Sequence, residues 1–182
     1  MKTPTALLAL ALALAGCGAA PEPANVATGN EAQSAAASAR ALPALTGRVV
    51  DLADLLSPAQ EAALTARLAA LERQTSDQLV IVTTPSLGGE AIEAYGLRLG
   101  NGWGIGQAGR NNGVLLIVAP KERRTRIAVG RGLERTLTNE QATGIIRDDL
   151  LPHFRAGRWH EGIEAGTAAI IARLTAAGQG AK

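Results

Sequence analysis

The chain has 182 residues and a formal net charge of +2, and aromatic residues make up only 2% of it. A charge this small gives no electrostatic argument for nucleic acid as a partner, and so few aromatic rings leave little surface on which bases or sugars could stack. We therefore expect no nucleic acid among the partners, and the length leaves room for one domain of ordinary size after the N-terminal segments.

The N-terminus has the pattern of an export signal. Lys2 precedes an apolar run over residues 6–15, which is too short to span a hydrocarbon core of about 30 Å and is typical of a secretory signal. Residues 14–17 read Leu-Ala-Gly-Cys and resemble a bacterial lipobox, in which Cys17 is lipidated. Cys17 is the only cysteine, whereas exported proteins ordinarily use cysteines in pairs. The alternative is an ordinary signal peptide with a cysteine near the cleavage site.

These features predict a lipoprotein signal peptide over residues 1–16 and a membrane anchor at Cys17, since more than one acyl chain gives stable attachment. Gly18 follows the cysteine and, by resemblance to the sorting rule of bacteria with two membranes, favours the outer membrane. We expect the protein in the cell envelope, facing the periplasm or the exterior. Residues 17–41 are rich in small and polar residues and cannot bury enough apolar surface to fold, so they are expected to form a flexible tether.

A folded domain is expected over residues 42–176, followed by a C-terminal tail at 177–182. Its first helix begins with Ser57 as N-cap and Pro58 at the first helical position. Caps, helical spacing and β-branched runs give the other elements: strands over 79–82, 114–119 and 124–129, and helices from about 90, from Thr138 to Pro152, and over 159–174. The order αβαββαα predicts an α/β fold, a three-layer α/β/α sandwich with a small mixed sheet, Rossmann-like but without a nucleotide site.

The absence of a nucleotide site is inferred from the Gly-rich segment. Residues 104–109 match the GxGxxG pattern of dinucleotide-binding loops. That fingerprint requires a strand before the glycines and a helix after them, so that the phosphates meet the helix N-terminus. Here a predicted helix comes first and a strand follows. We therefore interpret the segment as a connection whose glycines need positive φ angles.

Arginines gather around the predicted hairpin. Arg124 and Arg126 lie two residues apart on one strand, hence on one face of it. Two guanidinium groups on one face are suited to binding phosphate or lipid headgroups. The alternative is that these charges protect an edge strand from aggregation.

Six short stretches follow one another across residues 47–174 in a recognisable series. They are residues 50–57, 78–83, 103–106, 112–116, 126–134 and 151–157. In this order they resemble the TPM domain, a family named from a thylakoid lumen phosphatase-like protein, a photosystem II repair protein and a modulator of nematode acetylcholine receptors. The resemblance implies an α/β/α sandwich, in agreement with the predicted elements.

The resemblance also implies candidate site residues. Some TPM members are acid phosphatases and some bind calcium through acidic loop residues, and the family pattern places Asp where this chain has Asn111 and Asn139. Together with Asn112 and Glu134 these residues form the implied metal-binding set, with calcium as the implied cofactor. Each Asn removes a negative charge on which calcium affinity depends, which counts against a metal site and a metal-assisted phosphatase.

Three functions follow from these observations. The first is a non-catalytic module that binds an unknown envelope protein in membrane or envelope maintenance, with its interface on the side of the Gly-rich loop and the hairpin. The second is a calcium-dependent acid phosphatase, and the third is an anion or lipid-headgroup binding module built on Arg124 and Arg126. We favour the first, because the missing carboxylates weaken the second and the small net charge weakens the third.

Overall fold

The computed structural model describes residues 42–180. The predicted signal peptide over 1–16, the lipidation site Cys17 and the tether over 17–41 lie outside the described residues. Within the described part of the chain, no helix combines the length and the apolar character needed to cross a membrane.

A four-stranded sheet with the strand order β1-β2-β3-β4 forms the centre of the fold. β1 (Val49–Asp51), β2 (Gln78–Thr83) and β3 (Gly113–Ala119) are parallel, and β4 (Arg124–Val129) pairs with β3 in the opposite direction. β3 is buried along its whole length because it has a strand on each side and helices over both faces. The predicted mixed sheet is confirmed, and β1 is an addition to it.

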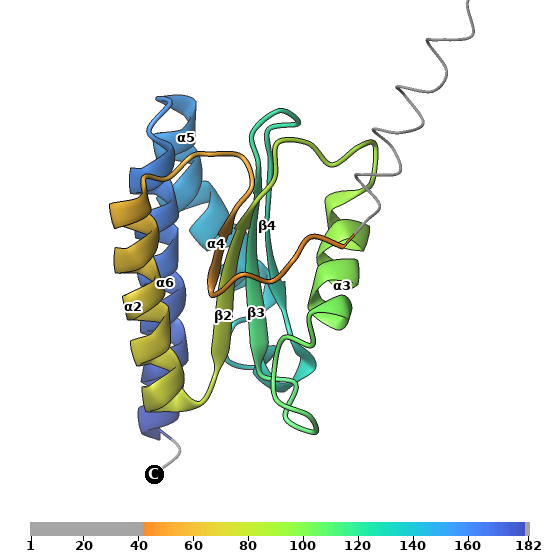
Figure 1. Cartoon of the computed structure of the whole chain (residues 1–182). Helices are drawn as coiled ribbons and strands as arrows, with labels where there is room; N and C mark the ends of the chain where they lie inside the picture. Colours follow the sequence, from red (N-terminus) through yellow and green to blue (C-terminus); the bar gives the residue numbers. More distant parts are fainter. Residues whose placement is uncertain (1–41, 181–182) are drawn as a thin grey trace, which may run out of the picture.

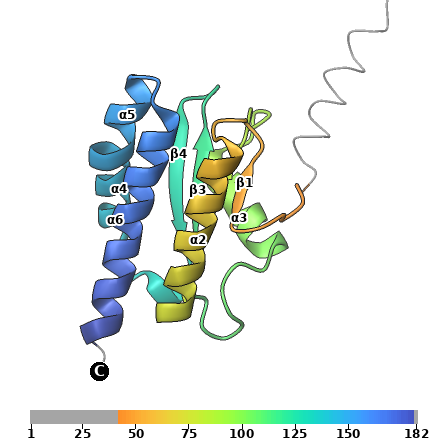
Figure 2. The ribbon, with the colours of Figure 1, turned by 60° about the vertical axis from the view of Figure 1, so that its left-hand side comes forward.

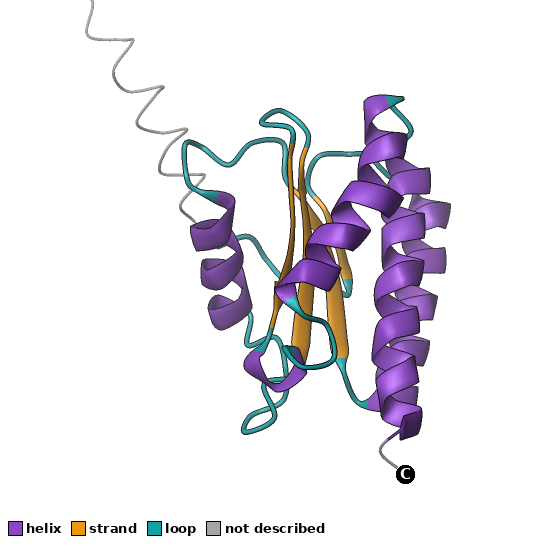
Figure 3. Cartoon of the chain, turned by 180° about the vertical axis from the view of Figure 1, so that it is seen from behind, coloured by secondary structure: helices purple, strands orange, loops and turns teal. Residues whose placement is uncertain are grey.

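Helices cover both faces of the sheet and give three layers (Figure 1). On one face, α2 (Pro58–Thr75) and α6 (Trp159–Gly180) lie next to each other, together with α4 (Asn139–Ile145) and α5 (Leu151–Arg155) (Figure 2). On the other face, α3 (Ile92–Gly102) is the only α-helix of the described residues (Figure 3). This arrangement confirms the predicted α/β/α sandwich.

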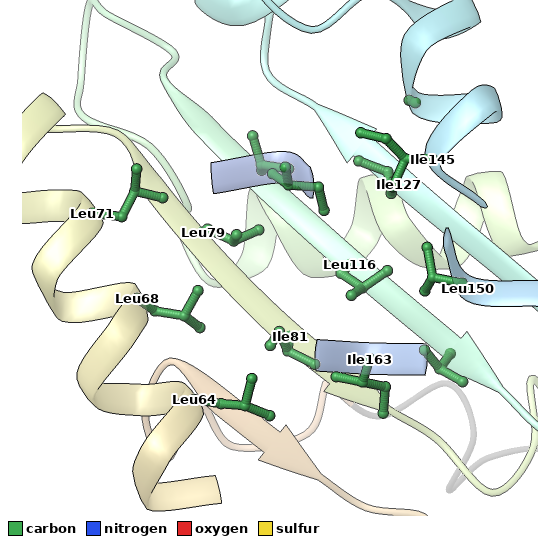
Figure 4. Close-up of a cluster of buried hydrophobic side chains, with 14 of the residues drawn as sticks. Leu64, Leu68, Leu71, Leu79, Ile81, Leu116, Ile127, Ile145, Leu150 and Ile163 are labelled. Carbon is green, nitrogen blue, oxygen red and sulfur yellow. The ribbon is translucent and has the colours of Figure 1, made fainter. Parts of the chain in front are cut away.

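Each face of the sheet has its own apolar core. The larger core lies under the helical layer of α2 and α6, and its members include Leu64, Leu68, Leu71, Leu79, Ile81, Leu116 and Ile163 (Figure 4). The smaller core lies under α3 and includes Tyr95, Leu99, Leu115 and Ile117. Because side chains alternate along a strand, neighbouring residues of β3 enter opposite cores. This is why the run in β3 is apolar at every position.

The helices of the second half depart from the prediction. Thr138 caps α4 with Gln141 in a capping box, as expected, but Pro152 does not end that helix. The chain continues through a π-helical turn, η2 (Ile146–Leu150), into α5, where Pro152 lies in the first turn. A proline is tolerated there because its missing N–H has no intrahelical partner in any case. The last helix also continues to Gly180, beyond the predicted end at residue 174.

Candidate functional site

The Gly-rich loop connects α3 to β3 at the end of the sheet where the parallel strands begin (Figure 1). Gly104, Gly106 and Gly109 have φ angles of +63°, +99° and +79°. These angles confirm the interpretation of the segment as a connection that needs left-handed backbone. The order of elements is helix, loop and strand, which is the reverse of a dinucleotide-binding loop.

The loop is held against the segment after β4 by close backbone contact. The N–H of Gly130 donates to the carbonyl of Gly113 at 2.7 Å, and the N–H of Gly132 donates to the carbonyl of Asn111 at 3.1 Å. A Cβ at Gly130 would overlap the carbonyl oxygen of Asn111, and one at Gly132 would overlap that of Arg110. Glycine is therefore required at both positions by the approach of the two backbones.

Asn112 fixes the base of this loop. Its side chain is buried, with 3% of the residue exposed. Its Oδ1 accepts from the N–H of Gln107 at 2.8 Å, and its Nδ2 donates to the carbonyl of Ser76 at 2.7 Å and to Oδ1 of Asp77 at 3.2 Å. Both ends of the amide are engaged, so Asn112 ties the loop to the turn between α2 and β2.

A second set of hydrogen bonds, from Gln78 at the start of β2, also holds the loop. Gln78 accepts from the N–H of Gly106 at 2.8 Å and donates to Glu72 at 3.0 Å. Glu72 in turn pairs with Arg48. The hydrogen bond from Arg48 and, to a smaller extent, that from Gln78 hold the pKa of Glu72 below its usual value, although its burial acts in the opposite direction. The carboxylate thus stays charged and keeps Gln78 oriented toward the loop.

A pocket of about 530 Å³ opens between α3, the loop and the segment after β4. The residues that line it are Gly96, Leu97, Gly100, Asn101, Ile105, Asn111, Gly113, Leu115, Ala128, Val129, Gly130, Arg131 and Glu134. Two of the four implied metal ligands, Asn111 and Glu134, therefore share one pocket. Asn112 is buried and already hydrogen-bonded, and Asn139 is an exposed residue at the start of α4 that does not line the pocket.

The charges of this pocket cancel. Its ionisable lining residues are Arg131 and Glu134, one of each sign. Calcium sites gain their affinity from several negatively charged oxygen ligands, and a positive charge in the same pocket opposes a cation. Among residues 42–180, no three His, Cys, Asp or Glu side chains gather where they could hold a metal ion. The pocket is thus better suited to hydrogen bonding and apolar contact than to holding a divalent cation.

The hairpin arginines do not form one site. Nη1 of Arg126 lies 3.2 Å from Oε1 of Glu93 on α3, whereas Arg124 lines a different pocket together with α5. The hairpin tip and the Gly-rich loop also lie at opposite ends of β3 (Figure 1). The segment after β4, at the other end of the hairpin, does lie against the loop. The interface expected on the side of the loop and the hairpin stays a prediction.

Leu97 was not among the residues that caps and periodicity indicated. This residue is 66% exposed, and the other exposed large apolar residues are 42–44% exposed. A signal for it was present in the sequence: the inner face of α3 is formed by Ile92, Tyr95 and Leu99, and Leu97 is out of phase with them. Leu97 thus adds an exposed apolar side chain to the lining of the pocket.

Comparisons with known proteins agree with this fold. The TPM domain family matches residues 49–173. The solution NMR structure of the N-terminal domain of a protein from P. gingivalis is 37% identical, with a TM-score of 0.69, and the match covers 74% of this chain and 85% of that chain.

Two more distant structures show the fold alone. The N-terminal domain of the cg2496 protein from Corynebacterium glutamicum is 14% identical, with a TM-score of 0.56 and coverage of 73% of this chain and 83% of that one. The BA42 protein from the psychrophilic bacterium Bizionia argentinensis is 16% identical, with a TM-score of 0.58 and coverage of 68% and 83%. No curated protein matches the chain significantly. The family match spans nearly the whole folded part, and the chain therefore belongs to the TPM domain family.

Proposed function

We propose that this protein is a lipid-anchored protein of the bacterial cell envelope whose TPM domain binds a protein partner and catalyses no reaction. The observation that carries the binding role is Leu97, the most exposed large apolar side chain of the described domain, at the edge of the α3 pocket. The lipobox at residues 14–17 supports the anchor.

The α3 pocket has the composition of a protein-binding surface. Leu97 and Val129 supply apolar contact, and Gly96 and Gly100 bring α3 close to the sheet. Polar side chains, including Arg131, complete the rim. Protein interfaces combine an apolar centre with a polar rim in this way. The partner that fits is a segment that places one apolar side chain against Leu97 and makes hydrogen bonds to the rim.

The hydrogen-bonded loop at the base of the pocket also favours binding. The loop beneath it is held by the buried amide of Asn112 and by backbone hydrogen bonds to Gly130 and Gly132. A surface that is already ordered loses little conformational entropy when a partner binds. The phosphatase hypothesis has less support, because the pocket offers one carboxylate, that of Glu134, and Arg131 lines the same pocket.

Crosslinking tests the interface. A photo-crosslinking amino acid in place of Leu97 is expected to give one discrete crosslinked product in intact cells, detected by immunoblot, because that side chain lies in the contact. The same amino acid in place of Ala66, an exposed residue of α2, is expected to give none. Asn101→Trp fills the pocket from an exposed position and should remove the product at residue 97 without lowering the melting temperature. Equal products at both positions, or a product that persists with Asn101→Trp, would refute the interface.

Membrane fractionation tests the anchor. Cys17→Ser removes the only residue that can carry the lipid, so the protein is expected to move from the membrane pellet to the soluble fraction. The matched control is Gly18→Asp, which keeps the cysteine and should leave the protein in the pellet. If Cys17→Ser is still recovered in the pellet after a wash with high salt, the anchor proposal is wrong.

A further inference from the structure

A second pocket, of about 700 Å³, lies at the opposite end of the hairpin, between the hairpin tip and the junction of α5 with α6. Arg123 and Arg124 line it from the hairpin, Arg155 from the end of α5, and Phe154 and Trp159 from the junction. We propose that this pocket binds a phosphate monoester that carries an apolar group. The proposal is independent of the protein-binding role of the α3 pocket.

The charge of this pocket is not neutralised within the described part of the chain. Its lining residues include three arginines and no acidic side chain. No ion pair within residues 42–180 involves Arg123, Arg124 or Arg155, whereas Arg126 of the same strand pairs with Glu93.

The nearest carboxylate in the sequence is directed elsewhere. Glu122 is part of the hairpin tip, but its Oε1 accepts from Oγ of Ser86 at 2.7 Å and from the N–H of Leu87 at 3.0 Å. Glu122 is thereby fixed to the loop after β2. Arginines at three positions of one pocket lining suit a ligand with more than one negative charge, and a phosphate monoester carries between about 1.5 and 2 negative charges at neutral pH.

The apolar part of the ligand is inferred from the aromatic wall. The ring centroids of Phe154 and Trp159 are 4.9 Å apart, with the planes tilted by 39°. The whole chain has only one Phe, one Tyr and two Trp, so half of its aromatic side chains line this pocket. Aromatic rings beside guanidinium groups accommodate a ligand that joins an anion to an apolar or planar group.

The backbone at Arg123 gives a separate indication that its side chain has a role. Arg123 has a φ of +52°, in the turn that its N–H closes by donating to the carbonyl of Pro120 at 3.2 Å. Glycine adopts this left-handed conformation without strain, whereas an L residue with a side chain does not. Arginine at this position therefore lowers stability but adds a cation to the pocket, as is common for strained residues at binding sites.

The test uses fluorescence of the full chain, purified in a non-ionic detergent, with Trp103→Phe so that Trp159 is the only tryptophan. Titration with phenyl phosphate is expected to change the emission of Trp159 at millimolar concentration or below. Arg155→Ala and Arg123→Gly should each weaken binding by about tenfold. Arg123→Gly should also raise the melting temperature, so a loss of binding in this variant cannot result from unfolding. Arg173→Ala, which removes an exposed charge farther along α6, should bind like the parent.

A second titration, with a short-chain lipid, identifies the source of the phosphate. If soluble dihexanoyl phosphatidic acid changes the emission of Trp159 at a lower concentration than phenyl phosphate does, the ligand is a lipid headgroup. If it needs a higher concentration than phenyl phosphate, the ligand is a soluble organic phosphate, and either result supports the site. The proposal is overturned if the emission of Trp159 does not respond to phenyl phosphate, or if Arg155→Ala and Arg123→Gly bind it as tightly as Arg173→Ala does.

Discussion

Asn112→Ala is expected to lower the free energy of unfolding by about 3 kcal/mol. The substitution removes three hydrogen bonds of a buried side chain, those to the N–H of Gln107, the carbonyl of Ser76 and the carboxylate of Asp77, and Asp77 is itself buried. Each buried polar group that loses its partner costs about 1–3 kcal/mol, partly offset where water enters. Urea denaturation followed by circular dichroism measures the change.

The matched control for Asn112→Ala is Asn101→Ala, an exposed residue of α3 whose replacement should change stability by no more than about 0.5 kcal/mol. Hydrogen exchange gives a second readout, because the N–H of Gln107 loses the acceptor that protects it. If the two alanine variants unfold at the same urea concentration, Asn112 does not fix the loop.

Gly130→Ala is expected to destabilise the domain by about 2–4 kcal/mol, for a steric reason alone. The φ of Gly130 is −68°, so alanine is allowed there by the backbone conformation. The added methyl group would overlap the carbonyl oxygen of Asn111 and lie 3.0 Å from that of Gly113. These are backbone atoms at the start of β3, which cannot move aside as a flexible side chain does, and overpacking of this kind costs several kcal/mol at most.

The opposite result is expected at Gly144, which makes Gly144→Ala the control for Gly130→Ala. Gly144 lies within α4, and a Cβ there would meet nothing within 4 Å. Alanine in a helix is better than glycine by about 0.5–1 kcal/mol, so this variant should melt at a higher temperature than the parent. Thermal denaturation should show a lower melting temperature than the parent for Gly130→Ala and a higher one for Gly144→Ala. A Gly130→Ala variant as stable as the parent would show that the two backbones are not in contact.

The elements that the sequence predicted well are those with local signals. Ser57 and Thr138 cap their helices as expected, because an N-cap hydrogen bond involves residues three positions apart. β1 was missed because three residues, Val49–Asp51, show no measurable period. The prediction that the helix from Thr138 ends at Pro152 was wrong. The π-helical turn before Pro152 leads the chain into a new helix, and the proline lies in the first turn of that helix.

The two pockets differ in how far the sequence could predict them. Val114 pairs with Val129 in the hairpin, and the same register brings Asn111 opposite Gly132. The meeting of Asn111 with residues just beyond β4 could therefore be worked out from the hairpin alone. The approach of Arg155 to the hairpin tip could not, because it depends on how α5 packs after the π-helical turn.

The single helix on one face of the sheet has a mechanical consequence. Detachment of α3 exposes only the smaller core, whereas detachment of α2 or α6 exposes the larger one. The free energy needed to detach a helix is therefore lowest for α3. Leu97 lies on the outer surface of this helix. If a partner binds Leu97 while the N-terminus is anchored, any force between the two acts on α3. We expect such a force to detach α3 before the other helices.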